Sequence, residues 1–368
     1  MVKIVLEHLT KKFKEGKREV TAVKDLNLEI PHKIIAGILG PSGCGKTTTL
    51  RMIAGLTEPS TGRILFDDKD VTSLPPRERN VALMFQFPVV YDTMTVFENL
   101  SLPLRVYDFK KEEINRKVND IAEFLGLSSI LYKKAKGLPA AINQKIALGR
   151  ALIRNPAVLL LDEPLSSLDP ETRLYFRREL KNVIKSMEST VIYVTHDQSE
   201  AMTLCDKIAV MNEGSLVQYD TPENIYSIPA NKFVGWFIGE PGMNFIDVSL
   251  KFSDNRAFLM LDEDIKFDVS KWSSSLKDIG QVVLGIRPEF VKISREKGVN
   301  TLLAKCRAKE VFRSYALLEF EAKNIIIKVK TSSIENLPME GEYMYLNFPP
   351  ENIRLYDKNS GKLLVVMK

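Results

Sequence analysis

A glycine-rich loop from Gly40 to Thr47 constrains this chain more than any other stretch of its sequence. The loop reads Gly-Pro-Ser-Gly-Cys-Gly-Lys-Thr and directly follows the apolar run 34–39. It fits the pattern G-x-x-x-x-G-K-[ST], in which backbone N–H groups close around phosphate oxygens. The apolar run predicts a buried parallel strand, and residues 47–54 predict a helix that stops near Gly55. A strand, a phosphate-binding loop and a helix in this order predict an α/β fold that binds a nucleotide.

The loop supplies several kinds of contact to a nucleotide. We expect Lys46 to reach the β- and γ-phosphates and the hydroxyl of Thr47 to ligate Mg²⁺. The helix N-terminus adds a partial positive charge beside the phosphates. The expected ligands are therefore ATP and Mg²⁺. The loop residues expected to hold the nucleotide are Gly40, Pro41, Ser42, Gly43, Cys44, Gly45, Lys46, Thr47 and Thr48.

Length and composition predict two to three domains of an ordinary globular kind. The chain has 368 residues, of which 45% are hydrophobic and 27% charged, and its net charge is only +5. This charge permits a membrane-surface or nucleic-acid partner without favouring either. The N-terminus does not fit a signal peptide, and no apolar run approaches the roughly 20 residues that span a bilayer. The three cysteines are far apart, which favours a reducing compartment. We therefore expect a cytoplasmic chain whose membrane role comes through partners.

Three further strands are predicted to end in polar residues. The apolar run 81–85 ends at Gln86, the run 157–161 ends at Asp162 and Glu163, and the run 191–195 ends at His196. Parallel sheets bind ligands at the carboxyl ends of their strands. Asp162 can hold Mg²⁺ through water, and Glu163 is placed to act as the base for an attacking water. Gln86 can bind Mg²⁺ or that water, and His196 can contact the γ-phosphate.

Each of these four residues also has a plain structural interpretation. Two carboxylates after a strand can cap the next helix, and a glutamine after a strand is usually an ordinary loop residue. A single histidine is more often structural than catalytic. The phosphate loop upstream raises the weight of the functional interpretation for all four residues.

The segments before and after the phosphate loop are predicted to differ in structure. Residues 1–33 predict short strands with a hairpin turn near residues 15–17. Phe13 lies between these strands in a polar segment, either as a satellite core residue or as a platform for an adenine ring. Residues 93–149 predict helices, including one over 110–125 that Gly126 stops. We interpret them as a helical insertion between strands of the nucleotide-binding core.

The C-terminal third has a different pattern. After a break at residues 239–242, short alternating strands follow without long helices, as in a small β-barrel of the OB kind. Residues 288–293 and 350–355 share the order Pro-Glu-x-apolar-basic-apolar, a weak internal repeat. OB barrels can bind oligonucleotides, but no cluster of basic and aromatic residues in the sequence supports that function.

Taken together, these motifs resemble the ATP-binding subunit of an ABC transporter, of the carbohydrate-importer type with a C-terminal TOBE/OB-like regulatory domain. Besides the Walker A loop, residues 81–86 resemble the Q-loop, 162–164 end the Walker B strand, 165–170 resemble the D-loop and 195–197 the H-loop. The resemblance implies an ABC ATPase domain over 1–238, with a helical subdomain at about 90–150, and a β-barrel domain over 243–368. It also implies that Phe13 stacks on adenine and that Asp169 contacts a partner ATPase subunit.

The resemblance further implies the partners and the location of the chain. Two ATPase subunits meet head to tail on the inner face of the cell membrane, bound to two permease subunits. An extracytoplasmic solute-binding protein delivers the solute, here a sugar or polyol, and no nucleic acid is involved. Residues 87–91 and the helical insertion are implied to form the groove for the coupling helix of the membrane subunits.

One motif departs from the family pattern. Residues 138–142 read Leu-Pro-Ala-Ala-Ile where the family has LSGGQ. Pro139 offers neither a hydroxyl nor an N–H, and alanines replace both glycines. We therefore favour a heterodimer with a second ATPase subunit whose signature is regular. The alternatives are a tolerated variant, a regulatory subunit with little turnover, and a soluble ABC ATPase outside transport.

Overall fold

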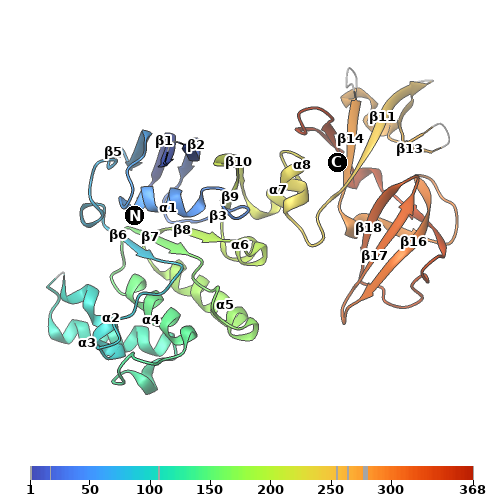
Figure 1. Cartoon of the computed structure of the whole chain (residues 1–368). Coiled ribbons are helices and arrows are strands. Elements are labelled where there is room, and N and C mark those ends of the chain that lie inside the picture. Colours follow the sequence, from blue (N-terminus) through green and yellow to red (C-terminus); the bar gives the residue numbers. More distant parts are fainter. Residues whose placement is uncertain are drawn as a thin grey trace. The chain divides into compact units, whose positions relative to one another are not determined.

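The protein divides into two compact units, Met1–Pro222 and Glu223–Lys368 (Figure 1). The structure is a computed structural model that describes residues 2–16, 18–106, 108–253, 256–262, 265–276 and 281–367. The expected domain limits, 1–238 and 243–368, place the boundary later than these units do. Those limits remain a prediction.

A six-stranded, mostly parallel sheet forms the centre of the first unit. Its strand order is β10-β9-β3-β8-β7-β6, and only β10 is antiparallel to its neighbour. The strands are β3 (Ile35–Leu39), β6 (Val81–Met84), β7 (Val158–Asp162), β8 (Thr190–Thr195), β9 (Lys207–Asn212) and β10 (Ser215–Asp220). Every residue of β3, β7 and β8 is buried, because helices cover strands of this kind on both faces. The four strands predicted from apolar runs are confirmed.

A four-stranded antiparallel sheet packs beside the parallel one in the order β2-β1-β4-β5. Its strands are β1 (Ile4–Glu15), β2 (Arg18–Ile30), β4 (Thr61–Phe66) and β5 (Lys69–Asp70). The prediction of short strands before residue 33 was wrong, since β1 and β2 have 12 and 13 residues. Phe13 also lies inside β1, opposite Val20, and not between strands. The first four residues of β2 are exposed on both faces and only its last five alternate between buried and exposed, so the apolar pattern did not reveal its length. The turn predicted near residues 15–17 includes Lys17, which lies outside the described residues.

Helices join and cover these sheets. The predicted helical insertion is present between β6 and β7. The helices of the first unit are α1 (Lys46–Ala54), α2 (Val96–Arg105), α3 (Lys111–Phe124), α4 (Ala140–Leu152), α5 (Pro170–Ser186) and α6 (Gln198–Leu204). Short 3₁₀ turns are η1 (Pro76–Glu78) and η2 (Ser128–Ile130). Helix α1 packs Leu50 and Ile53 into the core between the two sheets, which fixes the loop before it.

The second unit begins with two short helices, and two antiparallel sheets follow. One sheet has the order β13-β12-β11-β14-β20-β21 and the other β15-β19-β16-β17-β18. Its helices and turns are α7 (Pro222–Ser227), α8 (Lys232–Phe237), η3 (Ser270–Ser275), η4 (Pro288–Phe290) and η5 (Pro350–Asn352). Its strands are β11 (Asn244–Ser253), β12 (Arg256–Met260), β13 (Lys266–Asp268), β14 (Gln281–Ile286), β15 (Lys292–Ser294), β16 (Thr301–Val311), β17 (Ala316–Ala322), β18 (Ile325–Thr331), β19 (Tyr343–Asn347), β20 (Arg354–Asp357) and β21 (Leu363–Val366).

The weak repeat noted in the sequence has a structural counterpart. In both copies the Pro-Glu pair begins a 3₁₀ turn, η4 or η5. The next strand, β15 or β20, starts at the basic residue of the pattern. Both apolar residues of the pattern, Val291 and Ile353, are buried in the core shared by the two sheets. The repeat therefore reflects two equivalent strand-turn-strand corners.

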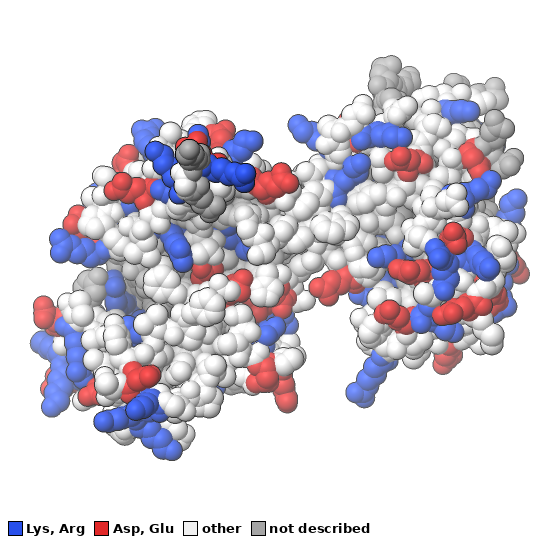
Figure 2. Space-filling view, viewed as in Figure 1, with Lys and Arg blue, Asp and Glu red and all other residues white. Residues whose placement is uncertain are grey.

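Charge is spread over both units. On the face in Figure 2, Lys and Arg side chains alternate with Asp and Glu, as expected from the small net charge. Among the described residues, no helix is long and apolar enough to cross a membrane.

Candidate functional site

The phosphate loop joins the end of β3 to the start of α1, and two of its glycines have no room for a side chain. Gly45 has φ 101°, and a Cβ there would lie 2.4 Å from the carbonyl oxygen of Ala22. A Cβ on Gly40 would lie 2.3 Å from the carbonyl oxygen of Met211. Lys46 is 8% exposed, and its Nζ donates to the carbonyls of Gly40 (2.8 Å) and Pro41 (2.9 Å). The loop is therefore folded back around the Lys46 side chain, whose two hydrogen bonds join the end of the loop to its start.

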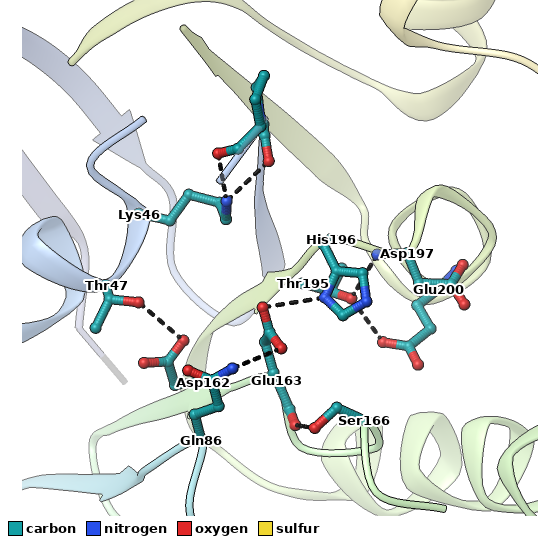
Figure 3. Close-up of polar contacts among 12 residues, drawn as sticks. Lys46, Thr47, Gln86, Asp162, Glu163, Ser166, Thr195, His196, Asp197 and Glu200 are labelled. Carbon is teal, nitrogen blue, oxygen red and sulfur yellow. Dashed lines mark hydrogen bonds and ion pairs between the residues drawn. The ribbon is translucent and has the colours of Figure 1, made fainter. Parts of the chain in front are cut away.

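Asp162 faces the phosphate loop from the end of β7. The hydroxyl of Thr47 donates to its Oδ1 over 3.4 Å (Figure 3). Burial raises the pKa of Asp162, and the hydrogen bond from Thr47 offsets this only in part. A hydroxyl beside a buried carboxylate, with the amide of Gln86 close by, is an oxygen set that suits Mg²⁺. A cation there would also compensate the buried negative charge.

Glu163 lies between Gln86 and His196. Its Oε2 accepts from Nε2 of Gln86 at 3.1 Å, and its Oε1 lies 3.0 Å from Nδ1 of His196 (Figure 3). Its backbone has φ 48°, and its N–H donates to the carbonyl of Val194 in β8. The side chains of Gln86, at the end of β6, and His196, at the end of β8, thus converge on the carboxylate of Glu163 after β7.

A cavity of about 400 Å³ opens between the loop and this carboxylate. Its volume is in the range of small-ligand sites. Its lining residues are Ala22, Ser42, Gly43, Gly45, Lys46, Thr47, Thr48, Gln86, Glu163 and His196.

Some residues predicted for the site do not line this cavity. Gly40 and Pro41 contribute carbonyls to Lys46, and Asp162 lies behind Thr47. Cys44 is buried, with its Sγ 3.9 Å from Nζ of Lys46, and burial raises the pKa of its thiol.

Phe13 and Asp169 also lie outside the lining. Phe13 is 40% exposed on β1, with the Lys11 ammonium 5.2 Å from its ring centre. Asp169 caps α5 by accepting from the N–H of Thr172 at 2.9 Å. That capping contact lies within the chain, and it leaves the Asp169 side chain exposed.

Gln144 was missed by the sequence analysis. It is 1% exposed on α4, and its Nε2 donates to the carbonyls of Glu163 (3.3 Å) and Pro164 (3.0 Å). Its Oε1 accepts from the hydroxyl of Ser167 at 2.9 Å. The amide therefore fastens the helix that follows the altered signature to the backbone at Glu163. The sequence offered no signal for this role, because the burial of Gln144 becomes visible only in the folded chain.

A buried carboxylate supports the turn that carries His196. Glu200 is 3% exposed and accepts from the hydroxyls of Tyr193 and Thr195, each at 2.9 Å. Burial raises the pKa of Glu200, and these two hydrogen bonds oppose the shift. Asp197, beside His196, caps α6 by accepting from the N–H of Glu200. The histidine is thus presented from a turn fixed on both sides.

The altered signature forms the exposed start of α4. Pro139 is the N-cap residue with φ −56° and ψ 150°, and it makes no side-chain capping bond. Its carbonyl accepts from the N–H groups of Ile142 and Asn143. Pro139 and Ala140 are both exposed. The helix N-terminus itself is therefore preserved, while the side-chain donor is missing.

Comparisons with known proteins identify the families that the two parts of the chain match. Residues 23–166 match the family model "ABC transporter", and residues 239–291 match the model "MalK OB fold domain". These matches confirm the predicted ATPase fold and the OB-like fold that follows it.

Relatives extend over nearly the whole chain. The trehalose/maltose import ATP-binding protein MalK of Thermococcus litoralis is 40% identical over 94% of this chain and 96% of its own length. The sn-glycerol-3-phosphate import ATP-binding protein UgpC of Yersinia pestis is 36% identical over 98% of this chain and 99% of its own.

A solved structure supports the same assignment. The ATP-binding cassette MJ0796, as a dimer in a post-hydrolysis state bound to ADP and phosphate, aligns with a TM-score of 0.56 and 28% identity. The alignment covers 60% of this chain and 98% of that one. Because of these matches and the converging site residues, the chain belongs to the ABC transporter family, as an ATP-binding and ATP-hydrolysing subunit of solute import.

Proposed function

We propose that the chain hydrolyses Mg²⁺-ATP in the cavity between the phosphate loop and Glu163, with Glu163 as the general base. The single observation that carries this proposal is the position of Glu163, held by Gln86 and His196 opposite Lys46. A carboxylate in that place can take the proton of an attacking water, and the histidine can contact the γ-phosphate. Lys46 supplies positive charge for the transferred phosphoryl group.

Thr47, Asp162 and Gln86 are the proposed holders of Mg²⁺. The cation would neutralise phosphate charge, while these side chains fix its place. The glycine-rich loop from Gly40 to Thr48 would hold the phosphates through its backbone N–H groups. Phe13 would stack on the adenine ring, for which its exposed face is suited.

The test of the base is Glu163→Gln. This variant keeps the shape of the side chain but cannot accept the proton, so hydrolysis should fall by a factor of at least ~100. Binding of ATP should stay within a few-fold of wild type, because the phosphate loop is unchanged. Hydrolysis at the wild-type rate would overturn the assignment of Glu163.

The solute is proposed to be a sugar or polyol. The relatives import trehalose, maltose or sn-glycerol 3-phosphate, as their names state. Membrane and binding subunits choose the solute, so this assignment depends on relatives of the ATPase alone. Uptake of labelled sugars and polyols into vesicles carrying the assembled transporter would test it.

Two permease subunits are proposed to dock on an exposed apolar surface beside β6. Phe87 is 80% exposed, Val89 57% and Tyr91 43%. Arg150 stacks over Tyr91 and donates to the carbonyl of Val89 at 2.6 Å, which shapes the surface. A hollow of about 350 Å³ lies among Val89, Tyr91, β6, Pro103 and α4. Docking there would hold the chain on the inner face of the cell membrane, and no nucleic acid takes part.

The partner ATPase subunit is proposed to be a second, different chain with a regular signature. The exposed start of α4 presents Pro139, which has no donor for a partner's γ-phosphate. The purified chain alone should therefore hydrolyse ATP slowly, and the regular partner should restore turnover. Full activity of the pure homodimer would contradict the heterodimer.

A further inference from the structure

The second unit contains a groove that brings together basic and aromatic side chains from distant parts of the sequence. Its volume is about 900 Å³, and strands β12, β13, β16 and β19 contribute to its walls. Figure 1 labels β13 and β16 within this unit. The basic and aromatic residues that line it are Arg256, Lys266, Lys297, Lys305, Lys323, Phe258, Tyr343 and Tyr345.

One wall of the groove is apolar and aromatic. In the pairing of β16 with β19, Leu303 lies opposite Tyr345 and Lys305 lies opposite Tyr343. Alternate residues of a strand share one face, so these four side chains form a single surface. Tyr343 is 62% exposed and Leu303 is 49% exposed. An aromatic face of this kind suits the C–H face of a ring such as a sugar.

The described lining of the groove carries an excess of positive charge. Among the described residues that line it, five are basic and two, Asp268 and Glu321, are acidic. Glu321 pairs with Arg307 at 3.6 Å, outside the lining. Hydrogen bonds from Ser270 hold the pKa of Asp268 below its usual value, so this carboxylate stays ionised beside Arg256 and Lys266.

Two of the lysines, Lys297 and Lys305, show neither an ion pair nor a ring contact among the described residues. Lys323 pairs with Asp262 at 2.9 Å, and Lys266 lies over the ring of Phe258. For Lys297 and Lys305 the described part of the chain shows no ion pair, and both are exposed. Exposed ammonium groups beside an aromatic wall can bind a phosphate and the ring attached to it.

We propose that this groove binds a phosphorylated sugar or polyol, with Lys297 and Lys305 on the phosphate and Tyr343 against the carbon skeleton. Its volume falls within the range of small-ligand sites, which favours a metabolite over a polymer. The choice of a sugar rests on the proposed function, because imported sugars or polyols are the solutes proposed above. The groove itself does not depend on that choice.

The test is calorimetric titration of the full-length Lys46→Ala variant, in which the phosphate loop is disabled. The probes are glucose 6-phosphate, sn-glycerol 3-phosphate, AMP, glucose and inorganic phosphate. We expect saturable binding of a phosphorylated sugar or polyol, and glucose to bind at least ~10-fold more weakly. The most tightly bound probe identifies the group attached to the phosphate. If AMP binds most tightly, the ligand is a nucleotide and the proposed sugar or polyol is wrong.

Matched substitutions decide whether the groove is the site. The double variant Lys297→Gln/Lys305→Gln should weaken binding on the order of 10-fold or more, and Tyr343→Ser several-fold. The control Lys251→Gln/Lys328→Gln removes two exposed lysines of the same unit that do not line the groove. It should leave binding within about 2-fold.

Several results would overturn the proposal. They are no saturable binding of any phosphorylated probe, equal weakening by the control, or tighter binding of a single-stranded oligonucleotide or poly-glutamate. The same groove substitutions are also made in the chain with Lys46 intact, where loss of ATP hydrolysis would show general damage and would also count against a separate site. Failure of Glu163→Gln to block hydrolysis would instead contradict the proposed function and leave the groove unaffected.

Discussion

Nδ1 of His196 lies 3.0 Å from Oε1 of Glu163, which joins the end of β8 to the residue that follows β7. The His196 side chain is 65% exposed, while that of Glu163 is 15% exposed. The histidine is therefore the outer member of the pair, placed to contact a ligand while it orients the carboxylate.

The first prediction concerns this pair. His196→Ala should lower kcat on the order of 100-fold, because it removes both the phosphate contact and the orientation of Glu163. Binding of ATP should change only a few-fold. The matched control is His32→Ala, since His32 also contacts a carboxylate, Asp67, at 2.9 Å but lies on the surface away from the cavity. Steady-state hydrolysis and equilibrium binding distinguish the two variants, and an active His196→Ala enzyme would refute the role.

A second prediction concerns the altered signature. The triple variant Pro139→Ser/Ala140→Gly/Ala141→Gly restores the hydroxyl donor and the close backbone approach. Hydrolysis by the pure homodimer should rise at least ~10-fold. Ala140→Gly/Ala141→Gly without the serine serves as control and should gain much less. An unchanged rate in the triple variant would mean that the helix N-terminus of α4 suffices.

The buried Asp162 leads to a prediction about stability. Burial raises its pKa in the folded state, so the folded chain binds the proton more tightly than the unfolded chain. Its contribution to stability is therefore favourable at low pH and is lost as pH rises from the ordinary value of 3.8 through the folded pKa.

Asp162→Asn should accordingly raise Tm at pH 7 without Mg²⁺-ATP, by about 2 °C or more, with a smaller gain at pH 5. Mg²⁺-ATP should then stabilise only the wild type. Asp70→Asn is the control, and it should lower Tm at pH 7. Hydrogen bonds from Thr72 lower the pKa of Asp70, so its ionised carboxylate stabilises the folded chain. Thermal unfolding at several pH values is the measurement, and a lower Tm for Asp162→Asn at pH 7 would contradict the expectation.

Gln144 is predicted to be a positioning residue. Gln144→Met keeps the length but leaves the carbonyls of Glu163 and Pro164 without their buried donor. We expect kcat to fall about 10-fold with ATP affinity nearly unchanged. Asn99→Leu is the control, since Asn99 is equally buried on α2 and bonds the backbone of Tyr91 and Thr95.

A double-mutant cycle sharpens this prediction. Ser167→Ala removes the donor to Oε1 of Gln144, so its effect should vanish in the Gln144→Met background. Additive effects of the two substitutions, or equal losses of kcat in Asn99→Leu, would reduce Gln144 to a general contributor to stability.

The parallel core and its site could be predicted from the sequence because each core strand is a recognisable apolar run. Apolar runs ending in Gln86, Asp162, Glu163 and His196 required only the topology of a parallel sheet to bring those side chains together. The full length of β1 and β2 was not predicted, since the first four residues of β2 are exposed on both faces and apolar alternation is confined to its last five.

Contacts between segments that are distant in the sequence could not be predicted either. The side-chain amide of Gln144 donates to the carbonyl of Glu163, which lies 19 residues further along the chain. No local sequence pattern predicts this hydrogen bond. The groove residues Lys305 and Tyr343 become neighbours only through the pairing of β16 with β19. The linear sequence therefore does not reveal the basic and aromatic residues that the fold brings together in this groove.

The left-handed backbone at Glu163 has a consequence for engineering. A residue with a side chain at φ 48° carries strain of about 1 kcal/mol or more that glycine would relieve. Because Glu163 is the proposed base, directed evolution for heat resistance alone should favour Glu163→Gly and yield stable transporters that do not hydrolyse ATP. A selection in which growth depends on uptake of the solute would keep glutamate at this position. The highest Tm that the selected variants reach would then be lower.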